Sequence, residues 1–145
     1  MNKIIHREQL SADVVLMRVS APLIAEERKP GQFVIVQIDS AYGERIPLTI
    51  ADADQREGSI TLIFQAVGST TRRMAALREG EQIENLVGPL GRPTHIAKFG
   101  TVVGVGGGIG IAPLFPIAQA MKNAGNRLII IMGARNKALI ILEER

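Results

Sequence analysis

Cysteine and tryptophan are absent from this chain of 145 residues, and histidine occurs only twice, at His6 and His95. Without cysteine the chain has no disulfide, no thiolate nucleophile and no cysteine-ligated zinc or iron–sulfur cluster. Because the two histidines lie far apart in the sequence, we expect no metal site. Aromatic residues are also scarce, with four Phe and one Tyr. The core must therefore be packed by Ile, Val and Leu.

The excess of positive over negative charge is also small. The formal net charge is only +3, and no basic run carries the interleaved aromatic residues that stack on bases. We therefore expect no nucleic-acid partner, and an anionic small cofactor explains the basic excess equally well. Residues 99–121 carry no charge, a length that could cross a membrane. The consecutive glycines at 106–108 would leave backbone groups unpaired in lipid, so we expect no membrane span. Residues 1–6 lack the apolar core of a signal peptide, which predicts a cytoplasmic protein.

Short apolar runs, several of them alternating with period two, predict strands through the first 95 residues. The expected strands are residues 3–10, 14–19, 32–38, 45–51, 59–67 and 82–87. Residues 70–79 read as a short helix that stops before Gly80. Residues 26–29 read as a charged loop and residues 88–93 as a turn-rich linker. Pro47 cannot donate to a ladder, so its strand is expected at an edge or to be irregular. Together these signals predict an antiparallel β-barrel or sandwich.

After Pro93 the pattern changes to a continuous apolar strand, a glycine turn, a helix over 111–123 and a second strand over 128–132. This order predicts a βαβ unit in a parallel sheet. We place a domain boundary near His95, giving domains 1–95 and 96–145, with a second helix beginning in 137–145. A doubly wound domain normally has five or six strands, so we expect a truncated α/β domain. Its exposed strand edge predicts pairing with another copy as a homodimer, or disorder of the last residues.

The glycine cluster between Gly104 and Gly110 is the clearest candidate site. Bare backbone before a helix N-terminus suits a phosphate group. The cluster does not satisfy G-x-G-x-x-G in any register, no acidic residue ends the second strand, and no Walker A motif is present. The alternative is that these glycines only permit close packing between the helix and the sheet.

Two upstream segments add weaker signals. Arg45, beside an expected edge strand, offers a fork of donors that can pair with phosphate, and Thr49 offers a hydroxyl. The segment Gly68-Ser69-Thr70-Thr71 supplies hydroxyl and N–H groups at a helix start. Taken alone, the first is most simply a surface arginine and the second a helix cap.

In order along the chain, these segments resemble the ferredoxin–NADP reductase superfamily over the whole sequence. The segments that carry the resemblance are Arg45-x-Pro47-Leu48-Thr49, Gly68-Ser69-Thr70-Thr71, Gly88-Pro89-Leu90-Gly91 and Gly106-Gly107-Gly108-Ile109-Gly110-Ile111-Ala112-Pro113. They are most similar to the branch that contains two electron-transfer proteins. These are the small subunit of NADH-dependent ferredoxin:NADP oxidoreductase (sulfide dehydrogenase) and the dihydroorotate dehydrogenase electron-transfer subunit. Gly133-Ala134-Arg135-Asn136-Lys137 also resembles this branch.

The resemblance implies a flavin-binding antiparallel β-barrel of Greek-key type, followed by an NAD(P)-binding α/β domain that is incomplete here. It implies a catalytic role for Thr49, whose hydroxyl would lie near the flavin N5. The implied FAD-binding residues are Arg45, Pro47, Leu48, Thr49, Gln65, Gly68, Thr70 and Thr71. The implied NAD(P)H-binding residues are Gly106, Gly107, Gly108, Gly110 and Arg135. Many relatives have tyrosine where Leu48 stands, and some have glycine where Thr70 stands.

The implied function is that of a flavin-dependent oxidoreductase subunit. It would pass electrons between NAD(P)H and FAD and on to an iron–sulfur partner. The implied partners are a larger flavoprotein or iron–sulfur catalytic subunit, and ferredoxin. Full-length relatives carry a [2Fe–2S] cluster on cysteines that this chain lacks. Two alternatives stay open: a non-catalytic FAD-binding or subunit-docking fragment, inactive by itself, and a dihydroorotate dehydrogenase electron-transfer subunit.

Overall fold

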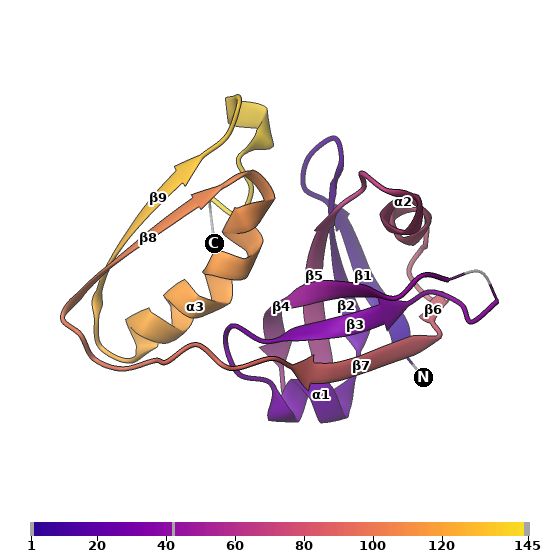
Figure 1. Cartoon of the computed structure of the whole chain (residues 1–145), viewed down its shortest axis with the longest axis horizontal. Helices are drawn as coiled ribbons and strands as arrows, with labels where there is room; N and C mark the ends of the chain where they lie inside the picture. The colour runs from indigo at the N-terminus through magenta and orange to yellow at the C-terminus, as the bar shows by residue number, and fades with distance from the viewer. Residues whose placement is uncertain (1, 42, 144–145) are drawn as a thin grey trace.

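The computed structural model describes residues 2–41 and 43–143. Two units lie side by side, joined by an extended segment that runs along the lower edge of Figure 1. The first unit is a seven-stranded antiparallel sheet that curls into a barrel-like body, with strand order β6-β1-β2-β5-β4-β3-β7. Its strands are β1 (Asn2–Gln9), β2 (Val14–Ser20), β3 (Phe33–Gln37), β4 (Ile46–Asp54), β5 (Ser59–Gln65), β6 (Gln82–Ile83) and β7 (Asn85–Leu90). The helices of this unit are α1 (Pro22–Glu27) and α2 (Ser69–Ala75). The predicted antiparallel barrel is confirmed.

The barrel core is built from alternate residues of its strands. Val15, Met17 and Val19 of β2 point inward, as do Leu62 and Phe64 of β5, and all five are buried. Because successive side chains of a strand face opposite sides, the intervening residues of these strands face away from the barrel interior. This second face becomes important below, because it receives the other unit.

Two segments differ from the sequence-based expectation. Residues expected as a charged loop are partly helical, because Pro22 starts α1 and Ile24 and Ala25 are buried against the barrel. The segment expected as a linker continues strand β7 to Leu90. There the absence of a side chain at Gly88 allows close approach to β3, since a Cβ would lie 2.8 Å from Val34 Cγ1.

The irregularity expected at Pro47 is confirmed. Pro47 pairs with Ile35 of β3 on one side. On the other side the ladder between β4 and β5 begins only at Ile50. The first half of β4 therefore has a free edge where the missing N–H of proline costs nothing.

The second unit contains β8 (Thr101–Gly107), the 3-10 turn η1 (Gly108–Gly110), α3 (Ile111–Asn123) and β9 (Arg127–Gly133). Strands β8 and β9 are parallel, in register from Thr101 opposite Arg127 to Gly107 opposite Gly133. The predicted βαβ unit is confirmed, including both ends of its helix. The expected second helix is wrong within the described residues. Only the 3-10 turn η2 (Lys137–Leu139) forms, because Ile140 is extended and Ile141 is buried among apolar residues where the second unit meets the barrel. Residues 144–145 of that expected helix lie outside the described part.

Helix α3 lies between the β8–β9 sheet and the barrel (Figure 1). The residues that form this contact are Val14, Leu16, Ala51 and Ile63 of the barrel, and Ile111, Ala112 and Ile141 of the second unit. We call this set the interface cluster. A helix covered on both sides has little surface for charged residues, which explains why α3 carries no charge before Lys122. Within the described residues, no helix is long and apolar enough to cross a membrane.

The segment that joins the units is extended and tied at both ends. The Thr94 amide donates to the Pro30 carbonyl at 2.9 Å on the barrel side. On the other side, the buried Asn126 accepts hydrogen bonds from the amides of Phe99 and Gly100 and donates to the carbonyls of Ala97 and Met121. The boundary near His95 falls between these two ties and stays a prediction.

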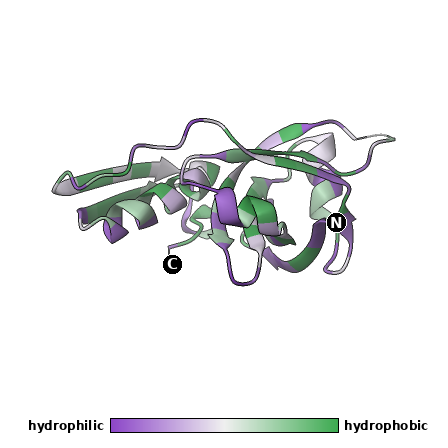
Figure 2. Cartoon of the chain, turned by 90° about the horizontal axis from the view of Figure 1, so that it is seen from below, coloured by the Kyte–Doolittle hydropathy of each residue, from purple (hydrophilic) through white to green (hydrophobic). Residues whose placement is uncertain are grey.

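The face of the β8–β9 sheet that points away from α3 is apolar and open. Val103, Val105, Ile129 and Ile131 are 55%, 71%, 40% and 54% exposed. Figure 2 shows both strands as largely green, hydrophobic ribbons at one end of the molecule. We call these four residues the outer face. An apolar patch of this kind is typical of a surface that another element or protein covers.

Candidate functional site

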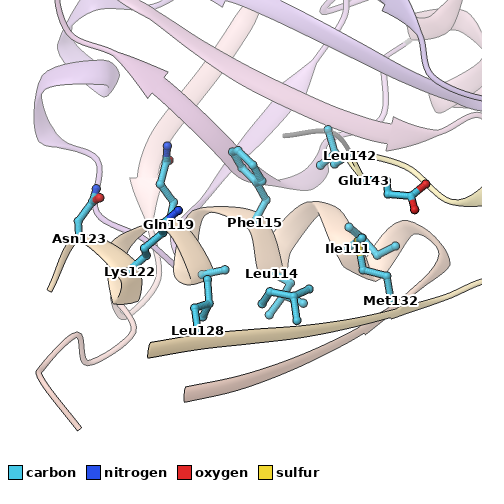
Figure 3. A pocket seen from close by; sticks show the side chains of 12 residues that line it. Ile111, Leu114, Phe115, Gln119, Lys122, Asn123, Leu128, Met132, Leu142 and Glu143 are labelled. Carbon is cyan, nitrogen blue, oxygen red and sulfur yellow. The ribbon is translucent and has the colours of Figure 1, made fainter. Parts of the chain in front are cut away.

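Two hollows adjoin the second unit. The first is an apolar groove of about 390 Å³ between α3 and the sheet. Figure 3 shows Leu114 and Leu128 pointing into it from the helix and from β9, with Met132 near its other end. None of the residues proposed above for phosphate or flavin binding lines this groove. It is therefore a gap in the packing of the α/β unit and not the candidate site.

The second hollow is a cleft of about 660 Å³ between the two units, which we call the inter-unit cleft. Its lining residues are Ser11, Asp13, Val14, Gln65, Gly107, Gly108, Ile109, Gly133, Ala134, Arg135 and Leu139. Four of the predicted site residues, Gln65, Gly107, Gly108 and Arg135, thus meet here. The cleft lies at the carboxyl ends of β8 and β9, which is where parallel α/β sheets bind ligands.

The glycines of the cluster divide into two groups. A Cβ at Gly106 would lie 3.0 Å from Leu114 Cδ2 and 3.3 Å from Ile111 Cα, so this glycine allows α3 to pack closely on β8. Next to Gly108 and Gly110, by contrast, no atom lies within 4 Å of the Cβ position. Gly108 also has φ +56°, a conformation that favours glycine. The packing explanation therefore holds for Gly106, whereas Gly108 and Gly110 stand in open space and phosphate binding there stays a prediction.

Asp13 is a residue that the sequence analysis missed. It lies in the tight turn between β1 and β2, and its main-chain carbonyl accepts a hydrogen bond from the Ala66 amide at 2.7 Å. Its carboxylate accepts a hydrogen bond from the Gln65 side-chain amide at 2.8 Å. These side chains are 52 residues apart in the sequence. Only the pairing of β2 with β5, which places Val14 opposite Gln65, brings them together.

A second group of predicted residues gathers around the start of α2, outside the inter-unit cleft. The Thr70 hydroxyl donates to the Glu44 carboxylate at 2.7 Å, which places the loop before Arg45 beside the helix. The Thr71 hydroxyl accepts from the Gly68 amide at 3.0 Å. Both hydroxyls thus have protein partners, and the remaining donors are the first-turn amides that every helix leaves free. The exposed Arg45 supplies a guanidinium nearby.

Two side-chain amides, those of the buried Gln37 and the half-buried Asn85, hold the loop that carries Arg45. Gln37 donates to the Gly43 carbonyl at 2.9 Å and accepts from the Asn85 side chain at 2.9 Å. A Cβ at Gly43 would lie 2.1 Å from the Asp39 carbonyl oxygen, so this position requires glycine. These contacts tie the backbone at Gly43 to β3 and, through Asn85, to β7. The main chain two residues before Arg45 is therefore held in place.

Strand β4 presents its predicted site residues on two faces. Leu48 packs partly against the barrel core, together with its neighbour Ile50. Pro47 and Thr49 alternate with them and share the face of Ala51, which belongs to the interface cluster. Thr49 is therefore on the side of β4 that faces the second unit, beside the free strand edge.

The ionisable groups of the described residues are spread over the chain. Within the described residues, no group of three His, Asp or Glu side chains could hold a metal ion. Burial lowers the pKa of the Arg28 guanidinium, an effect that the nearby Asp52 carboxylate opposes. Arg28 ends α1 and lies outside the residues that line the cleft.

Several known proteins are similar to this chain in sequence. No protein-family model matches the chain. It is 42% identical over 142 residues to the dihydroorotate dehydrogenase B (NAD(+)) electron transfer subunit homolog of Thermotoga maritima, covering 98% of this chain and 50% of that protein. It is 34% identical over 141 residues to the corresponding electron transfer subunit of Fusobacterium nucleatum, covering 94% of this chain and 54% of that one.

Among solved structures, the chain matches the NADH-dependent reduced ferredoxin–NADP oxidoreductase, described for flavin-based electron bifurcation. The TM-score is 0.96 at 42% identity, over 99% of this chain and 52% of that one. The chain thus spans about half the length of the curated relatives and of the solved structure that it matches. The predicted resemblance is confirmed.

Proposed function

This chain has a ferredoxin reductase-like fold and electron-transfer subunits as homologues, and we propose that it binds FAD and NAD(P)H within an oxidoreductase subunit. The subunit would pass electrons between NAD(P)H and FAD and on to an iron–sulfur partner. One observation carries this proposal. The open glycine turn of the α/β unit faces the end of the barrel strand that bears Gln65, across the inter-unit cleft.

The residues around α2 and β4 fit an elongated anionic flavin nucleotide. Arg45 would pair with its pyrophosphate, together with the first-turn amides of α2 after Gly68. Thr70 and Thr71 would shape this site while holding Glu44 and the helix start. Pro47 would line the flavin ring at the free edge of β4, and Leu48, whose side chain packs partly against the barrel core, would approach the ring with its backbone. Gln65 would lie between the flavin and the cleft.

The α/β unit fits a dinucleotide. The open backbone at Gly107, Gly108 and Gly110 would accept its phosphates, and Arg135 would lie beside them. Gly106 would contribute by bringing α3 close to the turn. When bound, FAD and NAD(P)H supply the hydride chemistry, and the protein binds and orients them. Thr49 would donate a hydrogen bond near the reacting flavin nitrogen, since it lies on the face of β4 that turns toward this unit.

The experiment is a visible spectrum of the purified chain after incubation with FAD and removal of free flavin. We expect retained flavin absorbance, and bleaching on anaerobic addition of NADH or NADPH. A chain that retains no flavin would contradict the proposal.

Arg45→Ala tests the phosphate contact. A hydrogen bond to a charged group contributes about 1.5–3 kcal/mol, so FAD affinity should fall at least roughly tenfold. Arg56→Ala is the matched control, because Arg56 is exposed in the turn between β4 and β5. Equal flavin retention in both variants would show that Arg45 does not hold the phosphate.

Thr49→Val tests the catalytic assignment. The two side chains have similar shape, and valine suits a strand, so the melting temperature should change little. Flavin reduction by NADH should slow because the hydroxyl donor is gone. An unchanged rate of flavin reduction would remove Thr49 from the reaction.

A second candidate function is docking without catalysis. The outer face favours it, because Val103, Val105 and Ile131 are exposed apolar residues on one sheet. The partner would be an iron–sulfur or flavoprotein subunit, ferredoxin, or a second copy of the chain. In analytical ultracentrifugation, a protein that never binds flavin but forms oligomers as its concentration rises would favour this function.

A further inference from the structure

The inter-unit cleft has two chemically different walls. The α/β wall offers bare glycine backbone at Gly107 and Gly108, and the cation Arg135. The barrel wall offers two acceptors, the Asp13 carboxylate and the Gln65 side-chain carbonyl, beside the Ser11 hydroxyl, which can donate or accept. A ligand that fits both walls must carry an anion on one side and hydrogen-bond donors on the other.

The acceptor wall is rigidly mounted. The β1–β2 turn is closed by hydrogen bonds from the Leu10 and Ser11 amides to the Val14 carbonyl, at 2.9 and 3.3 Å. The Gln65 amide nitrogen donates to one carboxylate oxygen of Asp13, at 2.8 Å. This contact orients the Gln65 carbonyl oxygen, and the second Asp13 oxygen keeps acceptor capacity. Because a carboxylate repels phosphate, the phosphates of a ligand belong on the opposite wall.

We propose that Asp13, positioned by Gln65, accepts hydrogen bonds from the ribose hydroxyls of the dinucleotide whose phosphates lie at Gly107 and Gly108. The inference rests on the proposed function and adds a residue that specifies an unmodified sugar diol. Hydroxyl groups are the donors that a nucleotide offers next to its phosphates. A charged acceptor makes shorter and stronger hydrogen bonds with them than a neutral one does.

The test uses the whole chain, loaded with FAD, and titrated with NAD+, because no electron transfer occurs between two oxidised cofactors. Asp13→Ala should weaken NAD+ binding about tenfold, which is the loss expected for hydrogen bonds to a charged group. Asp13→Asn should weaken it less, since an amide oxygen still accepts. Glu26→Gln on α1 removes the same charge away from the cleft and should leave NAD+ binding unchanged.

Mononucleotides identify which ribose is bound. If the diol is that of the adenosine half, Asp13→Ala weakens ADP binding. If it is that of the nicotinamide half, the variant weakens nicotinamide mononucleotide binding instead. Either result supports the proposal. ADP and 2′,3′-dideoxy-ADP provide a further check, because an adenosine diol at Asp13 predicts that the wild type prefers ADP and that Asp13→Ala largely loses this preference.

Three results would overturn the inference. An NAD+ affinity that is equal in the wild type and Asp13→Ala excludes the contact while leaving the proposed function intact. A variant that loses FAD and not NAD+ places a flavin hydroxyl at Asp13. A wild-type chain that binds neither FAD nor NAD+ refutes the proposed function and this inference together. Circular dichroism of each variant checks folding, which should persist because the Asp13 main-chain carbonyl still holds Ala66.

Discussion

Replacing Asn126 by alanine should loosen the connection between the two units. Its side chain makes four hydrogen bonds to the backbone while remaining only 7% exposed. Two of them, to the amides of Phe99 and Gly100, measure 2.6 and 2.9 Å and fix the end of the connecting segment. The other two, to the carbonyls of Ala97 and Met121, measure 2.8 and 2.9 Å.

The loss of stability depends on how many of these backbone groups can bind water once the Asn126 side chain is removed. Each hydrogen bond contributes about 0.5–1.5 kcal/mol net, and a buried group left without a partner costs about 1–3 kcal/mol. Phe99 and Gly100 are exposed, so their amides can bind water in the variant. The carbonyl of the buried Met121 keeps a hydrogen bond from the main-chain amide of residue 126, at 3.2 Å, so the loss comes mainly from the four side-chain hydrogen bonds themselves. We therefore expect Asn126→Ala to lower the free energy of unfolding by about 2–4 kcal/mol.

Urea unfolding followed by circular dichroism measures this change. Asn123→Ala is the matched control, because Asn123 is exposed near the end of α3 and alanine favours helix. Asn126→Asp keeps the acceptor for the two amides but loses the donors to the two carbonyls, so it should also destabilise. If Asn126→Ala changes stability no more than Asn123→Ala does, the side chain does not hold the connecting segment.

Glycine positions give two further predictions. At Gly31, with φ +92°, a Cβ would lie 2.3 Å from Thr94 Oγ1 and 2.9 Å from the Thr94 amide nitrogen, so Gly31→Ala should lower the melting temperature strongly. Gly80 has nearly the same φ, +91°, and no neighbour within 4 Å, so Gly80→Ala is the control without a clash. Equal losses of melting temperature in the two variants would exclude a clash with Thr94. Gly106→Ala should cost stability by pushing α3 outward, whereas Gly107→Ala should spare stability and weaken NAD+ binding. Thermal melts and NAD+ titrations separate them, and the reverse pattern would contradict the two glycine roles.

Much of the fold follows from local patterns. The bounds of α3 could be predicted from its sequence because the apolar run begins after glycine and ends before Gly125, where a helix normally stops. The alternation in β2 and β5 also marks their two faces. Helix α1 was missed because its six residues include three charged or proline positions, and only the burial of Ile24 and Ala25 against the barrel stabilises it.

The site was only partly predictable for a similar reason. The glycine turn and Arg45 carry local signals, since bare backbone and a guanidinium suit phosphate wherever they stand. Asp13 carries none, because an aspartate in a short polar turn is ordinary. Its relation to Gln65 exists only after strand pairing fixes the register. The same holds for Glu44 and Thr70, which a loop of the barrel brings together.

The interface cluster has a mechanical consequence for the proposed reaction. Among its buried members Val14 also lines the cleft, and together they set how far the barrel stands from α3. Protein interiors are close-packed and transmit displacements with little compression. Under the proposed function, Ala51 and Ile63 would therefore act as a spacer of fixed thickness between a flavin on β4 and a nucleotide on the glycine turn. Enlarging Ala51 would lengthen the path between two redox centres without altering a single atom that binds them.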